Sequence, residues 1–228
     1  MREAGALQNT ESKMSRNDAF VAMDRMYRFQ RYFYDLTRKY YLLGRDRLID
    51  QMEVAAGDNV LEIGCGTGRN LILLGRKRRG ANLFGLDASL EMLVTAAEKI
   101  SKSRQNIALK TALADDFGFD STFGLEKSFD VVFFSYSISM IPTWRESVEN
   151  ALGNLKSGGT LYIVDFYDQK DLPRWFQKLL LGWLRKFHVQ FWRDLLPYLK
   201  SLETSGLGTL SLTPLYRRYS FIAAFKKL

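Results

Sequence analysis

The chain has 228 residues, 46% hydrophobic and 25% charged, which is typical of a globular protein with a full core. Its net charge of +8 favours an anionic partner, either nucleic acid or an acidic membrane surface, although many solvated enzymes are simply basic. One cysteine and one histidine exclude a disulfide framework and a His/Cys metal cluster, and no apolar run reaches membrane-spanning length, so we expect a cytoplasmic protein without a metal.

The N-terminal part divides into a tail and a helical segment. Residues 1–19 are polar and lack the apolar core of a signal peptide, so we expect a disordered tail. Residues 20–56 are expected to form a helical lid, because apolar side chains recur at three- and four-residue intervals from Phe20 to Asp50.

Tyrosines and arginines follow the apolar stripe at regular spacing. If the helix is continuous, each tyrosine lies four residues before an arginine on the same side, Tyr34 before Arg38 and Tyr41 before Arg45. The pattern fits either a core stripe with a solvated basic face or a lid over a charged substrate. The stretch 34–37 leaves the continuity of the helix open.

The stretch Val60–Asn70 organises the rest of the chain. An apolar run ends in glycines at alternate positions, Gly64, Gly66 and Gly68, and a helical pattern follows, which predicts a strand, a tight turn and a helix. Asp87 comes 21 residues after Gly66 and closes a second predicted strand. An acid at that distance can accept hydrogen bonds from the hydroxyls of a ribose.

The glycine spacing argues against a dinucleotide site, because the third glycine of that fingerprint is replaced by Arg69. The sequence Glu-x-Gly-x-Gly-x-Gly, which begins at Glu62, resembles motif I of the class I S-adenosylmethionine-dependent methyltransferases. The resemblance implies S-adenosyl-L-methionine as the cofactor and S-adenosyl-L-homocysteine as the product. It implies these cofactor contacts: Glu62, Gly64, Cys65, Gly66, Gly68, Asn70, Asp87, Ala88, Met92, Asp115, Phe117 and Ser135.

Two of these contacts have specific expected roles. Asp115 resembles the family residue that accepts from the adenine amino group, and Phe117 is expected against the ring. The alternative is that Asp115 and Asp116 are simply turn residues. Cys65 is expected to be a small loop residue rather than a nucleophile.

The remaining pattern predicts an α/β fold, a Rossmann-like seven-stranded methyltransferase sheet over residues 57–228. Five strands alternate with helices, and two late strands with a short link predict a C-terminal antiparallel hairpin. After the first strand and its helix to about Arg79, the expected strands are Asn82–Asp87, Ile107–Leu113, Phe129–Phe134, Thr160–Phe166, Leu210–Tyr216 and Tyr219–Phe225, with helices over Leu90–Lys102 and Thr143–Lys156.

The segment 172–200 combines tryptophans, other apolar residues and cations at helical spacing. An apolar face with Trp175 and Leu179 is flanked by Arg174 and Lys178, which predicts a helix lying on a membrane surface. The alternative is a helix packed on the sheet.

Almost everything after residue 20 also shows a narrower resemblance, to the bacterial betaine-lipid N-methyltransferases. It implies that the protein methylates the amine of diacylglyceryl-homoserine three times at the inner face of the membrane, with the enzyme that makes this lipid as an expected partner and no nucleic acid. Arg218 stands where a small residue is expected. The resemblance lies in Met23–Tyr27, Tyr34–Asp46, Ser135–Trp144, Val164–Gln169, Leu172–Phe176, Phe187–Val189 and Leu215–Tyr219.

Methyl transfer to an amine requires a neutral nitrogen, so a base or a desolvating pocket is expected near the reacting centre. The catalytic candidates are Tyr34, Tyr136, Asp165 and His188, although His188 fits a polar helix surface equally well. The candidates for binding the substrate carboxylate and cation are Arg38, Tyr41, Arg45 and Arg217. The alternatives are a phosphatidylethanolamine N-methyltransferase, an RNA methyltransferase and a catalytically silent cofactor-binding partner.

Overall fold

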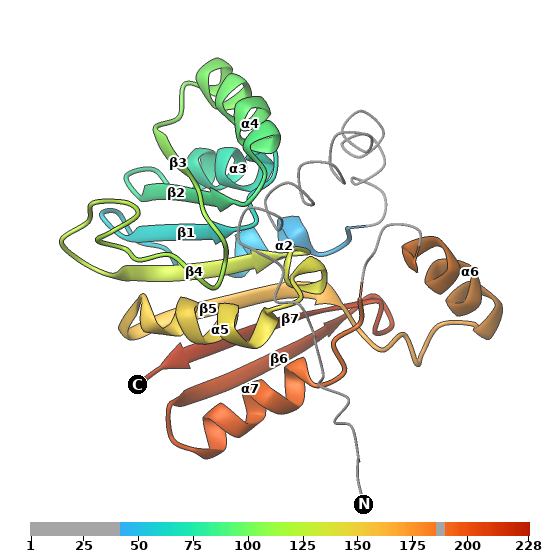
Figure 1. The fold of residues 1–228 in the computed structure, drawn as a ribbon. Helices are drawn as coiled ribbons and strands as arrows, with labels where there is room; N and C mark the ends of the chain where they lie inside the picture. Colours follow the sequence, from blue (N-terminus) through green and yellow to red (C-terminus); the bar gives the residue numbers. More distant parts are fainter. Residues whose placement is uncertain (1–41, 186–189) are drawn as a thin grey trace, which may run out of the picture.

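The computed structural model describes residues 42–185 and 190–228 (Figure 1). The expected tail 1–19 lies outside these residues. So does most of the expected lid, with Tyr34, Arg38 and Tyr41, and so does His188.

A seven-stranded sheet forms the centre of the described chain, in the order β3-β2-β1-β4-β5-β7-β6 (Figure 1). Strands β1 to β5 run parallel, and β7 is antiparallel to both β5 and β6. The expected seven-stranded sheet with a C-terminal hairpin is therefore confirmed. The strands are β1 (Asn59–Ile63), β2 (Asn82–Asp87), β3 (Ile107–Thr111), β4 (Phe129–Ser135), β5 (Leu155–Phe166), β6 (Gly208–Leu215) and β7 (Ser220–Lys227).

Helices cover both faces of the sheet, which accounts for the unbroken apolar run of β4. Val131 and Phe133 belong to a core cluster with α2 (Arg45–Gln51), α3 (Arg69–Lys77) and α4 (Leu90–Ser103). Val132 and Phe134 belong to the cluster with α5 (Trp144–Gly153) and α7 (Leu195–Thr204). Burial on both faces fixes the register of β4, and therefore where its carboxyl end lies.

The helical pattern predicted from Phe20 to Asp50 does not give one continuous helix, because the chain turns at Gly44. Gly44 has a φ of 97°, and α2 begins only after it, at Arg45. A Cβ on Gly44 would come within 2.7 Å of Leu215 Cδ1, so the chain approaches the sheet here as only glycine allows. The helix is interrupted because the preceding turn is bonded to the sheet, where the Leu43 carbonyl accepts from Ser220 Oγ at 3.2 Å.

The predicted boundary between the helix 143–156 and the strand that follows is also wrong. Helix α5 ends at Gly153, and β5 already begins at Leu155. The residue between them, Asn154, is tied to other segments, because its carbonyl accepts from Phe129 N and its side-chain oxygen accepts from Phe119 N. These tertiary bonds turn the chain into the sheet earlier than the predicted helix end at Lys156.

The single helix predicted over 172–200 is two helices, α6 (Arg174–Arg185) and α7. Between them, Gln190 N donates to the carbonyl of Ser139 at 2.9 Å. The Trp192 indole N–H donates to the carbonyl of Ile138, also at 2.9 Å. The chain is thus bonded to the short 3-10 helix η1 (Ile138–Met140) instead of continuing as a helix. Helix α7 packs on the sheet, whereas α6 stands beyond the carboxyl ends of β4 and β5 (Figure 1).

Candidate functional site

The loop between β1 and α3 has a backbone that requires its glycines. Gly64, Gly66 and Gly68 have φ values of 72°, 54° and 74°, in the left-handed region. A Cβ on Gly64 would lie 2.4 Å from the Cβ of Ser137. The Ser137 hydroxyl donates to the carbonyl of Ile63 at 2.7 Å, so the loop is closed against the chain after β4.

Asp87 holds this loop in place from the end of β2. Its Oδ2 accepts from Gly66 N at 2.7 Å and its Oδ1 accepts from Ser89 N at 2.9 Å, and the side chain is buried. A carboxylate has roughly four acceptor sites, so the same group that orders the loop can also accept from the hydroxyls of a ribose.

Glu62 and Asn70 connect β1 to α3 beneath the loop. The Asn70 side-chain amide donates to Glu62 Oε1 at 2.7 Å, and both side chains are buried. Burial raises the pKa of the neighbouring Cys65 thiol, and the carboxylates of Asp87 and Glu62 raise it further. Cys65 therefore stays a neutral thiol, as expected of a loop residue rather than a nucleophile.

The expected adenine side lies at the ends of β2 and β3. Ala88 and Asp115 are half-buried, whereas Met92 is buried in the first turn of α4. Phe117 is packed in the core cluster that contains α5, so its ring is mostly occupied by protein contacts. Asn150 donates to the carbonyl of Phe117 at 3.2 Å and so fixes this turn from α5.

The expected reacting side lies where β4 and β5 end next to each other. Ser135 pairs with Val164 in the sheet register, and its hydroxyl is buried without a hydrogen-bond partner among the described residues. The Tyr136 ring packs edge-on against Phe166, with 4.8 Å between centroids, and its hydroxyl donates to the carbonyl of Leu43. Burial raises the pKa of Tyr136 well above its usual value, so this phenol suits positioning better than proton transfer.

Asp165 is a buried carboxyl group beside this junction. Its Oδ2 accepts from Ser139 N at 3.1 Å and its Oδ1 accepts from Phe166 N at 2.7 Å. Burial nevertheless raises the pKa of Asp165 to about 7. A carboxyl group with such a pKa can both accept and release a proton near neutral pH.

The turn between β6 and β7 has an unusual backbone conformation. Tyr216, Arg217 and Arg218 have φ values of 50°, 57° and 60°, a conformation that non-glycine residues seldom adopt. Arg218 donates through Nε and Nη2 to the two carboxylate oxygens of Asp168, and its guanidinium lies 4.3 Å from the centroid of the Tyr167 ring. These contacts explain why an arginine stands where a small residue was expected.

The two predicted substrate arginines in the described chain have different environments. Arg217 is exposed at the tip of the β6–β7 turn. Arg45 is buried at the start of α2, and its Nε donates to the carbonyl of Leu42 at 3.3 Å. Arg217 is therefore the more accessible of the two for a carboxylate.

Sequence patterns gave no role to Ser137 or Gln169. Ser137 closes the glycine loop through contacts that only the fold creates. Gln169, in the loop after β5, is 2% exposed and has a φ of 57°. Both residues lie in stretches that carry the narrower resemblance, but the sequence gives neither of them a role, because burial and contact depend on the tertiary structure.

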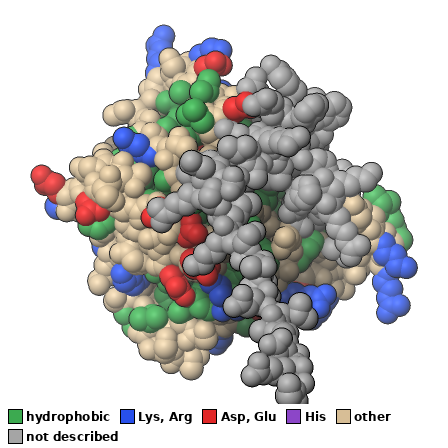
Figure 2. Space-filling model, in the orientation of Figure 1, with side chains coloured by type: hydrophobic (Ala, Val, Ile, Leu, Met, Phe, Trp, Pro, Cys, Tyr) green, Lys and Arg blue, Asp and Glu red, His purple; other side chains and the backbone are tan. Residues whose placement is uncertain are grey.

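Helix α6 presents apolar and basic side chains together. Trp175 and Leu179 are 68% and 66% exposed, and Arg174 and Lys178 beside them are exposed as well. Figure 2 shows hydrophobic and basic side chains side by side at the edge where α6 lies. Within residues 42–185 and 190–228, no helix combines the length and apolarity needed to cross a membrane.

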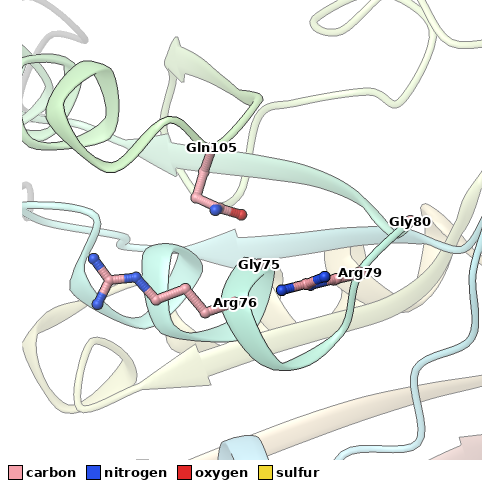
Figure 3. A pocket seen from close by; sticks show the side chains of 5 residues that line it. All are labelled: Gly75, Arg76, Arg79, Gly80 and Gln105. Atoms are coloured by element: carbon pink, nitrogen blue, oxygen red, sulfur yellow. The ribbon is translucent and has the colours of Figure 1, made fainter.

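A hollow of about 370 Å³ lies at the opposite edge of the sheet, near the amino ends of β2 and β3 (Figure 3). Arg76 and Arg79 line it, together with Gln105 and two glycines. Cations at the C-terminus of α3 suit the helix dipole, so this basic hollow is explained without a ligand.

Comparisons with known proteins show that part of the chain is similar to methyltransferases. A family model described as "Methyltransferase domain" matches residues 61–161. Methyltransferase GfsG of Streptomyces halstedii is 25% identical over 168 residues, covering 74% of this chain and 59% of that protein. A demethylmenaquinone methyltransferase of Listeria monocytogenes is 28% identical over 141 residues, covering 61% of this chain and 57% of that protein. The chain thus spans less than two thirds of the length of these relatives.

Solved structures share the fold. A putative methyltransferase in complex with the Haloferax volcanii Trm112 activator has a TM-score of 0.69 at 17% identity, covering 90% of this chain and 96% of that one. A putative S-adenosyl-L-methionine-dependent methyltransferase of Methanococcus maripaludis has a TM-score of 0.59 at 17% identity, covering 97% of both chains. The chain has the fold of these methyltransferases, and its residues 61–161 match the methyltransferase domain model. S-adenosylmethionine is the methyl donor of such a domain.

Proposed function

We propose that this protein is an S-adenosylmethionine-dependent N-methyltransferase that trimethylates diacylglyceryl-homoserine while docked on a membrane. The observation that carries the membrane docking is the exposed face of α6, and the choice of lipid comes from the narrower resemblance. Trp175 and Leu179 stand in solvent beside Arg174 and Lys178, at the sheet edge that also carries the glycine loop. Tryptophan and leucine flanked by cations are the composition of a helix that lies on an anionic lipid surface.

The chemistry at the ends of β4 and β5 supports amine methylation. The bound cofactor supplies a methyl group on a positively charged sulfur. The chain must orient a neutral amine toward it and exclude water. The pKa of Asp165, which burial raises to about 7, supports a role for this carboxyl group in taking up the amine proton. The buried rings of Tyr136 and Phe166 wall this side against solvent.

A second candidate comes from the relatives named demethylmenaquinone methyltransferases, which favour methylation of a lipid quinone. Phosphatidylethanolamine is a further candidate, because its amine would need the same proton removal. The α6 face suits all three lipids, so the substrates must be compared directly.

The test uses purified protein, labelled S-adenosylmethionine and vesicles that contain anionic lipid plus one candidate acceptor. We expect label in diacylglyceryl-homoserine, appearing in mono-, di- and trimethyl products. Label only in phosphatidylethanolamine or demethylmenaquinone would replace the proposed substrate. Cofactor binding without label in any lipid would contradict a lipid methyltransferase, and an RNA gel shift would then test the nucleic-acid alternative.

A further inference from the structure

The Gln169 side chain is buried with its hydrogen-bonding groups unsatisfied. It is 2% exposed, and neither Oε1 nor Nε2 has a hydrogen-bond partner among the described residues. Most buried polar side-chain atoms in folded proteins are paired, because burying an unpaired amide is costly. An unpaired, buried amide in a folded protein requires an explanation. One explanation is that the amide binds a polar ligand.

The backbone of Gln169 is held rigidly. Its N–H donates to the carbonyl of Arg218 at 2.9 Å, and its own carbonyl accepts from Leu172 N at 3.0 Å and from Gln177 Nε2 at 2.9 Å. Its φ of 57° is a left-handed conformation that costs energy for a residue other than glycine. Strained backbone conformations that surrounding hydrogen bonds hold in place are typical of ligand-binding positions. Here the strained residue also carries an unpaired amide.

Gln169 lies on the acceptor side of the site. It follows the last residue of β5, Phe166, by three positions, which span at most about 10 Å. Phe166 packs against Tyr136, the residue after the end of β4. The bond to Arg218 places Gln169 beside the β6–β7 turn that carries the exposed Arg217.

We propose that Gln169 is a specificity-determining residue that binds the α-amino-acid head group of the acceptor lipid. This inference rests on the proposed function. A primary amide carries an acceptor and a donor on one carbon, and the homoserine head group carries its amine and carboxylate on one carbon. Nε2 would donate to the carboxylate and Oε1 would accept from the amine. In phosphatidylethanolamine the amine and the phosphate are two carbons apart, so one amide matches them poorly.

The same contact distinguishes the unmethylated substrate from the trimethylated product. The neutral amine has N–H groups that can donate to Gln169 Oε1. In each of the first two rounds the nitrogen gains a methyl group from the sulfonium and then releases one proton, so the neutral amine loses one N–H per round. The neutral dimethyl intermediate has no N–H, and the third transfer converts it to the quaternary product without release of a proton. The product therefore loses one of the two bonds to Gln169 and binds more weakly than the substrate.

The test compares Gln169→Met, which keeps the size but removes both polar groups, with Gln177→Met as the control. Gln177 is in the same segment, and its amide is paired with the carbonyls of Gln169 and Leu172, so Gln177→Met gives the fall in Tm expected when a paired amide is removed. For Gln169→Met we expect the KM for diacylglyceryl-homoserine to rise about tenfold or more, with the KM for S-adenosylmethionine within about twofold and no fall in Tm. Calorimetric binding of a short-chain, soluble diacylglyceryl-homoserine should weaken by the same factor.

Three results would overturn the inference. They are an unchanged KM and unchanged binding of the homoserine lipid, a selective loss of cofactor affinity, or a fall in Tm as large as that of Gln177→Met. If the wild-type protein neither binds nor methylates the homoserine lipid, the proposed function fails and the inference fails with it. If the wild type methylates this lipid and Gln169→Met does so equally well, only the inference fails.

Discussion

At the scale of single residues, Asp87 joins two parts of the cofactor site that belong to different elements. One carboxylate oxygen orders the glycine loop after β1, and the other orders the start of α4. We therefore expect the residue to contribute to cofactor binding in two ways, by accepting hydrogen bonds from the ribose and by holding the loop beside it. Loss of the side chain removes both contributions at once.

We expect Asp87→Ala to weaken S-adenosylmethionine binding by about 10- to 100-fold, since a hydrogen bond to a charged group contributes about 1.5–3 kcal/mol. Titration calorimetry measures this directly. Asp87→Asn is the matched control, because it retains one acceptor oxygen and should lose less affinity. An unchanged cofactor Kd in Asp87→Ala would remove Asp87 from the site.

Asp165 makes the protein's stability depend on pH. Its pKa is raised to about 7 in the folded chain, so the folded state holds a proton that the unfolded state releases at a lower pH. The contribution of Asp165 to the free energy of unfolding is fully present below about pH 4. It is lost as the pH rises through about 7, and the total loss is as much as about 4 kcal/mol.

Asp165→Asn removes this dependence. We expect the variant to match the wild type in urea unfolding at about pH 3, where Asp165 is protonated in both the folded and the unfolded state, and to exceed it increasingly up to about pH 8. In the wild type kcat should rise with pH through about 7, and in the variant this limb should be lost. Parallel stability profiles for the two proteins would show that Asp165 does not titrate in this range.

At the scale of elements, the β6–β7 turn and α6 border the same edge of the sheet. Three left-handed residues strain the turn, and the pairing of Arg218 with Asp168 holds it. Helix α6 has neighbours mainly along one side, where Leu180 is buried, and leaves Trp175 and Leu179 in solvent. The turn is thus stabilised by specific contacts, whereas α6 retains an apolar surface that nothing in the described chain covers.

The strain in the turn predicts an unusual order of stabilities. Arg218→Gly and Arg218→Ala both lose the contacts to Asp168 and Tyr167, but only glycine relieves the left-handed backbone. We expect Arg218→Ala to be less stable than Arg218→Gly by about 1 kcal/mol in urea unfolding. Equal stabilities would mean that the backbone relaxes at no cost.

If α6 docks on the membrane, substitutions on its exposed face should weaken vesicle binding but leave the fold intact. Replacing Trp175 and Leu179 with serine should weaken binding to anionic vesicles by about 100-fold, since each buried side chain contributes about 1.5–3 kcal/mol. Flotation measures binding, and an unchanged Tm shows that the fold is intact. Leu207→Ser is the control, because Leu207 is also exposed but lies at the opposite end of β6. Equal binding of the double variant and the control would exclude docking through α6.

At the scale of the whole molecule, the sheet and its cofactor edge could be predicted because their signals are local. Alternate glycines after an apolar run mark the loop after β1, and short links mark the hairpin. The boundaries that failed depend on tertiary bonds. Asn154 turns the chain into β5 through contacts with distant segments, and Trp192 separates α6 from α7 by bonding to η1. The buried amide of Gln169 could not be found, because no pattern along the chain reports whether a side chain finds a partner.

The position of α6 at the same edge as the ends of β4 and β5 has a kinetic consequence for a lipid enzyme. A protein docked through this helix meets its next acceptor by diffusion in two dimensions. Its rate should then follow the mole fraction of acceptor in the bilayer rather than the total amount in the sample. Diluting the acceptor with inert lipid at constant bulk concentration would slow a docked enzyme, and the partly methylated intermediates would accumulate.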